Sequence, residues 1–280
     1  MASAPVIALL VTGEKAFEDF KVFVKSLEAW HPDAILYIAT DTPTATLLRG
    51  FKTKATLHTR ITLDRYVGLT RSDMEARVGL VYDSLFKDYT YEKATVLEEA
   101  LAAHPMGVWF QDADIVHLAP LPPIPVGASV ALSPHAIRPG DERLYGRYNA
   151  GYLWIRDPEL ISIWRAMGGK SRFYEQAALE DVATAAGAAL YEFPPQVNFG
   201  WWRMYQGVEP PSAIQARFGF NRMDRSAGLR YDNAPLQSIH THLYDKSTGA
   251  NGVFNKWLDN TTVKFASHPP LRTFRKTCGF

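Results

Sequence analysis

The sequence is poor in cysteine and carries almost no net charge. Cys278 is the single cysteine among 280 residues, which excludes an internal disulfide and a thiolate metal cluster and favours a reducing compartment. Lysine and arginine number 30, against 29 for aspartate and glutamate. This balance argues against a protein that binds nucleic acid through a broad basic face. Nucleic acid is therefore not an expected partner.

Long hydrophobic runs are also missing. No stretch approaches the 18 or so apolar residues that a membrane-spanning helix needs. The apolar run at residues 5–11 is too short to span a bilayer. A signal peptide has basic residues before its apolar run, and none precedes this one. We therefore expect no membrane span and a cytoplasmic location. Nothing in the sequence indicates a particular oligomeric state.

The residues that are present predict an α/β fold. Hydrophobic residues make up 47% of the chain and charged residues 21%, enough to form a sizeable buried core. Residues 6–11 and 34–40 are apolar runs typical of buried strands. Between them, large apolar residues recur from Phe17 to Trp30 at helical spacing. This strand–helix–strand order is typical of a parallel sheet covered by helices.

Further elements are expected along the chain. Proline-rich residues 118–125 predict a loop and the best internal boundary. Asp157 is a good N-cap for a helix that ends near Met167. Residues 203–235 show no clear pattern. The other expected helices span 73–86, 91–103 and 174–186, and the other expected strands span 108–110, 130–132, 151–155, 190–193 and 238–243.

Polar residues follow several of the predicted strands. Ligands of open parallel sheets bind beyond the carboxyl ends of the strands, which makes Thr12, Gly13, Asp41, Asp112 and Asp114 candidate ligand contacts. Asp112 and Asp114 flank one alanine, and two such carboxylates can hold a hard divalent cation that grips a diphosphate. With 16 aspartates in the chain, on the order of one such triplet arises by chance, so its context must support it.

Four segments supply that context, and with the aspartate pair they resemble the GT-A fold glycosyltransferases. The likeness is to the nucleotide-diphospho-sugar transferases related to the glycogenin and lipopolysaccharide galactosyltransferase group, and it covers most of residues 5–260. It implies a Rossmann-like GT-A domain over residues 1–280, with a mostly parallel central sheet, a nucleotide-binding half near 1–118, an acceptor and sugar half near 126–260, and a tail at 261–280. The four segments are residues 145–155, 173–181, 194–200 and 239–246.

The resemblance also implies a metal site. In that group the aspartate pair binds Mn²⁺ (or Mg²⁺), and Asp112 and Asp114 match it. A later histidine completes the site, and by spacing this is His240. His242 lies two residues on and would share one strand face with His240, so either imidazole could be the ligand. Lys246 matches a lysine that contacts the diphosphate.

Other residues match donor contacts of the group. Lys93 stands where the family has a basic residue on the helix before the aspartate strand, although an exposed lysine paired with a neighbouring glutamate is an alternative. Asn149-Ala150-Gly151 resembles the Asn-Ala-Gly that approaches the donor sugar, where small residues allow a close approach. Thr12, Gly13 and Asp41 are expected on the donor side as well.

Acidic and aromatic residues of the second half are candidates for catalysis and acceptor binding. Glu175 and Gln176 resemble the Asp-Gln pair of the family, with glutamate in place of aspartate. Asp181 is a rival carboxylate, because inverting members of the wider fold use a carboxylate near such a position as a base. Neighbouring aromatic residues could form a platform for an acceptor sugar. They are Trp201, Trp202 and Tyr205.

Five arginines give residues 203–235 a local basic bias, and we expect them to be solvated surface residues. They are Arg203, Arg217, Arg222, Arg225 and Arg230. A basic bias of this kind would suit an acidic acceptor.

The sequence thus predicts a metal-dependent hexosyltransferase that moves a sugar from a nucleotide diphosphate, with a UDP-sugar favoured, to a hydroxyl of an acceptor, most simply a glycan. The nearest resemblance implies retention of the anomeric configuration. One alternative is a haloacid-dehalogenase-type phosphatase with Asp112 as nucleophile, although its motif belongs on a first strand. Another is a non-catalytic module that binds nucleotide sugars or glycans.

Overall fold

The computed structural model describes residues 4–223, 226–241 and 249–278. Its main sheet has the strand order β3-β2-β1-β4-β7-β6-β8. The pairs β1–β2, β2–β3, β1–β4 and β6–β8 are parallel, and β7 runs antiparallel to both of its neighbours. The expected α/β class with a mostly parallel sheet is therefore confirmed. The strands are β1 (Val6–Val11), β2 (Ile35–Thr40), β3 (Thr56–Ile61), β4 (Val108–Gln111), β6 (Val130–Pro134), β7 (Tyr148–Ile155) and β8 (Leu190–Glu192).

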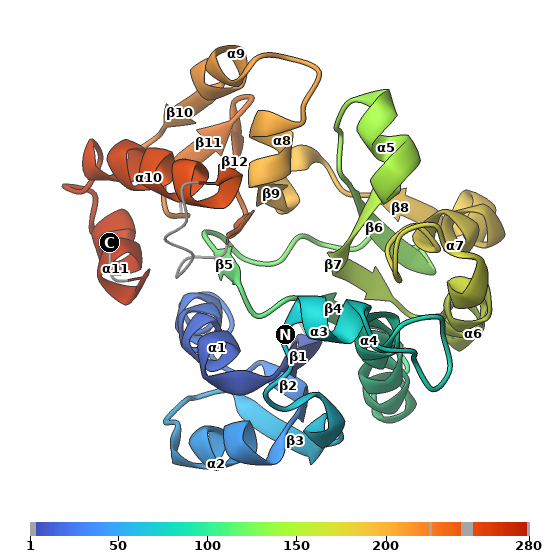
Figure 1. Ribbon diagram of the computed structural model, residues 1–280. Helices are drawn as coiled ribbons and strands as arrows, with labels where there is room; N and C mark the ends of the chain where they lie inside the picture. Colours follow the sequence, from blue (N-terminus) through green and yellow to red (C-terminus); the bar gives the residue numbers. More distant parts are fainter. Residues whose placement is uncertain (1–3, 224–225, 242–248, 279–280) are drawn as a thin grey trace.

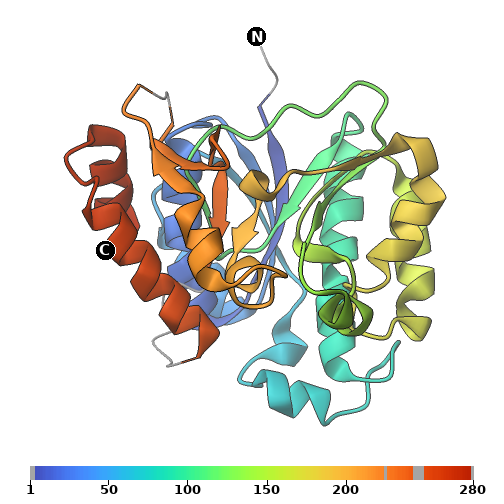
Figure 2. The same cartoon turned by 90° about the horizontal axis from the view of Figure 1, so that it is seen from above.

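Helices cover both faces of this sheet, as Figures 1 and 2 show. Alternate residues of β1 point to opposite faces, so Ile7, Leu9 and Val11 join one hydrophobic cluster while Ala8 and Leu10 join another. The first cluster packs beneath α1 (Gly13–Glu28) and α2 (Thr42–Gly50). The second packs beneath α4 (Leu85–Ala103), α6 (Pro158–Met167) and α7 (Leu179–Ala186).

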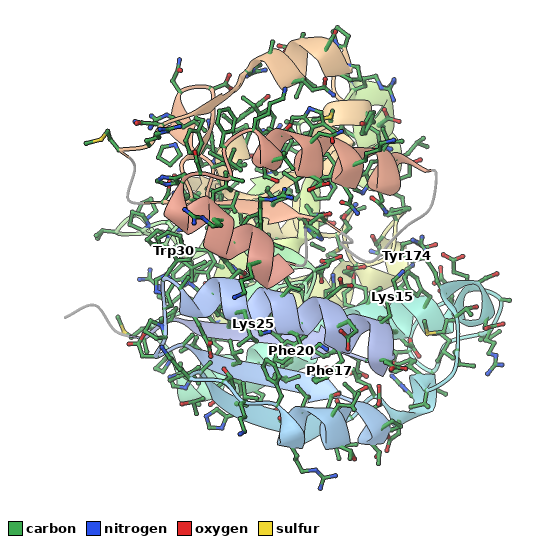
Figure 3. All side chains as sticks on the ribbon, turned by 90° about the vertical axis from the view of Figure 1, so that its left-hand side faces the viewer. Lys15, Phe17, Phe20, Lys25, Trp30 and Tyr174 are labelled. Carbon is green, nitrogen blue, oxygen red and sulfur yellow. The ribbon has the colours of Figure 1, made fainter. Side chains whose placement is uncertain are left out.

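A second layer holds two small sheets with the strand orders β5-β13-β9 and β10-β11-β12. Phe199 and Phe254 lie in its core, which also includes Val22 of α1. Figure 3 shows α11 lying along α1. The strands are β5 (Ile115–His117), β9 (Phe199–Gly200), β10 (Phe218–Phe220), β11 (Leu229–Tyr231), β12 (Ala234–Pro235) and β13 (Ser238–His240), and the helices are α8 (Trp201–Tyr205), α9 (Pro211–Ala216), α10 (Ala250–Val263) and α11 (Pro269–Cys278).

Residues 203–235, which gave no pattern, thus form short elements of this second layer. Strands β6, β7 and β8 follow the proline-rich loop, yet they join the same sheet as β1 to β4. The two halves of the chain are therefore joined across one sheet.

The helix expected at 73–86 is wrong. The chain forms α3 (Arg71–Glu75), leaves helical structure, and begins α4 only at Leu85, where Ser84 caps the helix by accepting from Lys87 N. The carboxylate of Asp88, in the first turn of α4, accepts hydrogen bonds from Val81 N and Tyr82 N. These side-chain hydrogen bonds hold the connecting segment as a loop, and they take the place of the backbone hydrogen bonds that a helix would form there.

Two other boundaries also differ from expectation. The helix expected from 174 begins only at Leu179, because Tyr174 has a φ of 40° in the left-handed region, which a right-handed helix does not admit. The late strand β13 ends at His240, and residues 242–248 lie outside the described residues. The N-cap predicted at Asp157 is confirmed, since its side chain accepts from Glu159 N.

Sequence patterns missed α2 and β3, and β3 is one of the two edge strands of the main sheet. Its residues are mostly exposed, so they lack the apolar alternation that marks a buried strand. Among the residues that the structure describes, no helix has both the length and the apolar character needed to cross a membrane.

A matched pair of leucines tests this description of the core. Leu36 of β2 is fully buried, whereas Leu80 in the loop before α4 is 78% exposed. We expect Leu36→Ala to lower the free energy of unfolding by about 2 to 5 kcal/mol, because it removes buried methyl groups and leaves a cavity. Leu80→Ala should change it by less than about 0.5 kcal/mol. Urea denaturation followed by circular dichroism measures both, and equal effects would contradict the description.

Candidate functional site

Two carboxylates and one imidazole converge where the main sheet meets the second layer. Asp112 and Asp114 lie in the turn that carries the chain from β4 of the main sheet to β5 of the small sheet. β13 pairs with β5 so that His240 stands opposite Ile115. His240 Nε2 lies 3.1 Å from Asp114 Oδ1 and 3.7 Å from Asp112 Oδ2.

This cluster fits a divalent cation. One ligand atom from each of the three residues can be chosen so that all lie within 4.8 Å of one another. Carboxylate oxygens with one imidazole nitrogen suit Mn²⁺, and the carboxylates alone suit Mg²⁺. The described residues thus confirm the proximity of Asp112, Asp114 and His240 that the sequence predicted. His242, the alternative ligand, lies outside the described residues.

The glycine at position 151 makes room for the cluster. The Asp112 N–H donates to Gly151 O at 2.8 Å, so β7 runs directly behind the aspartate. A Cβ atom at Gly151 would stand 2.2 Å from Asp112 Oδ2 and 2.5 Å from His240 Cε1. Any side chain there would push two of the three ligands away, which is why this position of the Asn-Ala-Gly segment requires glycine.

A buried polar network fixes the imidazole of His240. Asn198 is fully buried, and its amide nitrogen donates to Ser133 Oγ and to Asn149 Oδ1, each at 3.1 Å. Both of its hydrogens are therefore used, and its Oδ1 is left to accept from His240 Nδ1 at 3.3 Å. This arrangement directs His240 Nε2 toward the aspartates, in the manner of outer groups that orient metal-bound histidines.

Lys93 of α4 lies beside the cluster as a buried cation. Its Nζ is 3.2 Å from Asp112 Oδ1 and 2.9 Å from Glu175 Oε1, and it donates to Ala150 O at 3.4 Å. Burial by itself lowers the pKa of Lys93, but the carboxylates of Asp112 and Glu175 outweigh it and raise the pKa above its usual value. Lys93 is therefore a charged part of the site, and the alternative of an exposed lysine is wrong.

These groups line a cavity of about 890 Å³. The volume lies within the range of small-molecule sites and suits a nucleotide sugar. Lys15 of α1 and Tyr174 line it, and Figure 3 labels them close together at one end of α1. Arg71 lies over the rings of Phe86 and Tyr174 at the same cavity, with its guanidinium 4.8 and 5.1 Å from the two ring centroids.

The three residues predicted at the ends of β1 and β2 have different positions. Thr12 lines the cavity. Asp41 is 1% exposed, and its carboxylate accepts from Gly13 N at 2.9 Å and from Thr44 N at 2.7 Å, where it caps α2. Asp41 and Gly13 therefore hold the loop after β1 and do not line this cavity. Donor contact by these residues stays a prediction.

The acidic candidates in the second half of the chain also differ in whether they line the cavity. Glu175 and Gln176 line the cavity, and Gln176 Nε2 donates to Tyr145 O at 2.8 Å. Asp181 is exposed in the first turn of α7 and does not line this cavity. The structure therefore brings Glu175, rather than Asp181, to the metal-binding cluster.

The expected aromatic platform is only partly present. Trp201 and Trp202 line the cavity, whereas Tyr205 does not. Trp202 is 6% exposed, and its ring meets those of His135 and His240 edge to face. Trp202 thus packs against the imidazole of His240, which leaves Trp201 as the more accessible ring.

The remaining sequence predictions concern charged residues. Lys246 and Arg225 lie outside the described residues. Arg203 is 5% exposed, which corrects the expectation that it is a solvated surface residue.

The sequence placed Asn198 in the segment 194–200 but gave it no role, and it did not single out His135. Burial lowers the pKa of His135 to about 4, so this histidine is neutral at pH 7, and its Nε2 lies 3.5 Å from Asn149 Nδ2.

The first test of the site concerns Gly151. We expect Gly151→Ala to lower the affinity for Mn²⁺ by at least about tenfold, since a methyl group would displace Asp112 and His240. Gly140→Ala is the matched control, because the nearest atom to a Cβ there is 3.9 Å away. Electron paramagnetic resonance of free Mn²⁺ measures both affinities. Wild-type affinity in Gly151→Ala would contradict the proposed ligand set.

The second test concerns Asn198. Asn198→Leu removes the acceptor for His240 Nδ1, and we expect Mn²⁺ affinity to fall by about 10- to 100-fold. Ser133→Ala removes only a partner of Asn198 and should cost less than about tenfold. Thermal unfolding without metal shows whether each variant folds. An unchanged metal affinity in folded Asn198→Leu would exclude a positioning role for this asparagine.

No protein-family model and no curated protein sequence matches the chain. Among solved structures, mouse xyloside xylosyltransferase 1 in its apo form is similar at a TM-score of 0.52 and 10% identity, over 85% of this chain and 98% of that one. The galactosyltransferase LgtC, solved with donor and acceptor sugar analogs, has a TM-score of 0.52 and 14% identity, over 98% and 95%.

A third similar structure is the apo form of the bifunctional glycosyltransferase WbbM, with a TM-score of 0.53 and 12% identity. That alignment covers 99% of this chain and 52% of the longer WbbM chain. At such low identities, likeness establishes the fold alone. The chain accordingly has the GT-A fold found in these glycosyltransferases.

Proposed function

We propose that the protein is a metal-dependent glycosyltransferase that transfers a hexose from a nucleotide diphosphate, with UDP favoured, to a hydroxyl of an acceptor, with retention of the anomeric configuration. In this reaction the bond between the anomeric carbon and the diphosphate oxygen breaks. A new bond to the acceptor oxygen forms, and the hydroxyl proton is released.

The observation that carries the proposal is the convergence of Asp112, Asp114 and His240 at a cavity of about 890 Å³ on a GT-A fold. The fold alone does not define an activity. The ligand cluster lies just beyond the end of β4, where open α/β sheets bind nucleotides. A metal-binding cluster at that position, beside a cavity of nucleotide size, supports a diphosphate donor.

The three ligand residues would hold Mn²⁺ or Mg²⁺. When bound, such an ion offsets the negative charge that develops on a departing diphosphate. His240 is held by Asn198, and Asp112 is held by its backbone bond to Gly151, so the ligands are oriented before any ion arrives. Lys246, which lies outside the described residues, is proposed as a further diphosphate contact.

Lys93 and Glu175 have the complementary task of arranging the sugar side of the cavity. The Lys93 ammonium bridges Asp112 and Glu175, which fixes the Glu175 carboxylate relative to the metal ligands. We assign Glu175 and Gln176 to the side of the cavity where the sugar and acceptor meet. Asn149 lines the same cavity and can bond a sugar hydroxyl.

The two alternative functions have less support. A phosphatase of the haloacid dehalogenase type would use Asp112 as a nucleophile at the end of a first strand, but here Asp112 follows β4, after a complete strand–helix–strand unit. The similar solved structures are glycosyltransferases. A module that only binds nucleotide sugars would not need three clustered metal ligands.

An assay for nucleoside diphosphate release tests the proposal. Purified protein is incubated with a panel of nucleotide sugars and glycan acceptors, with and without Mn²⁺. We expect Mn²⁺-dependent release with UDP-sugars, reduced at least about 100-fold in Asp112→Asn and Asp114→Asn, because each change removes a ligand charge. Nuclear magnetic resonance of the product gives the anomeric configuration.

Asp33→Asn is the matched control for these variants, because Asp33 is an exposed aspartate outside the cavity. It should retain wild-type activity. Release of inorganic phosphate from phosphomonoesters, with nucleotide sugars untouched, would instead identify a phosphatase. Nucleotide-sugar binding with no turnover would identify a binding module.

A further inference from the structure

A second, smaller cavity of about 180 Å³ lies behind the wall of the main cavity. The segment before α5 (Pro139–Tyr145) forms part of that wall, and neighbouring residues in it line different cavities. His135 lines the main cavity and Ala136 lines the second. On α8, Trp202 lines the main cavity and Arg203 lines the second. The two cavities are therefore separate spaces on opposite sides of one layer of chain.

Arg203 is the buried charge of this second cavity. Its Nε donates to Asn198 O at 3.1 Å and its Nη2 donates to Pro134 O at 2.5 Å. Both acceptors are neutral carbonyl groups. Within the described part of the chain, no carboxylate lies within ion-pair distance of this guanidinium, and Nη1 donates no hydrogen bond.

A guanidinium in this environment is energetically costly. It is 95% buried, and burial lowers the pKa of Arg203 to about 10, which still leaves it charged at pH 7. A buried charge normally has a counter-charge, because carbonyl dipoles replace only part of its hydration. The guanidinium therefore favours an anion in the space that it lines, and Nη1 is the nitrogen available to bind one.

The other charged residues around the cavity are paired with one another. Arg217 also lines it and lies over the ring of Tyr231 with 4.8 Å between the guanidinium carbon and the ring centroid. Glu209 is the single carboxylate among the described lining residues, and it is paired with Arg217 Nη1 at 3.1 Å. Arg217 is also paired with Asp232, through Nε at 2.5 Å and through Nη2, so its charge is compensated. Among the described residues that line the cavity, Arg203 is therefore the guanidinium without a paired carboxylate.

We propose that this cavity is a binding site for one phosphate group, held by Arg203 on the far side of the main cavity wall. Its volume lies below the roughly 300 Å³ at which drug-sized ligands begin to fit, so a nucleotide belongs in the main cavity and a single oxyanion belongs here. The proposal is independent of the glycosyltransferase activity, because it uses none of the residues assigned to that reaction.

Phosphate titration of the metal-free protein tests the site. The thermal unfolding midpoint is followed in EDTA, with phosphate replacing chloride at constant ionic strength. We expect a saturable rise in the midpoint for the wild type and none for Arg203→Met. Glycerol 3-phosphate forms a second arm, in which an equal rise indicates that the phosphate group of a larger molecule also enters.

Glu209→Gln provides a variant that keeps the buried arginine. The Glu209 side chain is half exposed, so this change should leave the protein folded. Removing the carboxylate from the cavity should tighten phosphate binding by roughly three- to tenfold through reduced charge repulsion. Glu14→Gln, an exposed change on α1 outside the second cavity, should leave the affinity unchanged.

The comparison of these two variants decides the proposal even where Arg203→Met does not fold. Equal phosphate affinities in wild type, Glu209→Gln and Glu14→Gln would place the anion elsewhere, for example at Lys93 in the main cavity, and would overturn the assignment. A rise in midpoint no greater than that given by chloride would overturn it as well.

Discussion

The structure depends on one crossing of the chain from the main sheet to the second layer. Strand β4 ends at Gln111, and after three intervening residues β5 begins in a different sheet. The turn between them carries Asp112 and Asp114, so both carboxylates face the junction of the two layers. Because β7 supports this turn from one side and β13 from the other, the position of the metal ligands is set by both sheets together.

Charges at this junction are balanced by partners that lie far apart in sequence. Asp112 and Glu175 share the ammonium of Lys93, which limits the cost of placing acidic groups in a partly buried site. The side-chain oxygen of Asn198 accepts a hydrogen bond from His240 Nδ1. The side chains of this site are thus held in place before any ligand binds, and groups held in this way are the ones that stabilise developing charge in a reaction.

The features that the sequence predicted best are those that depend on the pattern of neighbouring residues. The strand at β1 and the helix capped by Asp157 follow from apolar spacing and a capping residue. The helix expected from residue 174 was wrong because Tyr174 takes a left-handed backbone conformation, which its residue type does not signal. Asn198 lies in the segment 194–200, which the sequence singled out. Its hydrogen bonds, however, go to side chains on three separate strands, and spacing along the chain does not predict such contacts.

The sequence by itself determined the α/β class and the aspartate pair as candidate metal ligands, since these follow from hydrophobic period and from donor chemistry. The late histidine, His240 or His242, came from the resemblance to the GT-A fold glycosyltransferases. The tertiary structure decided which candidates meet. It brought Glu175 to Lys93, left Asp181 exposed and buried Arg203 beside a small cavity. The physical reason is that burial and charge pairing depend on neighbours from other strands and helices, which the order of residues along the chain does not specify.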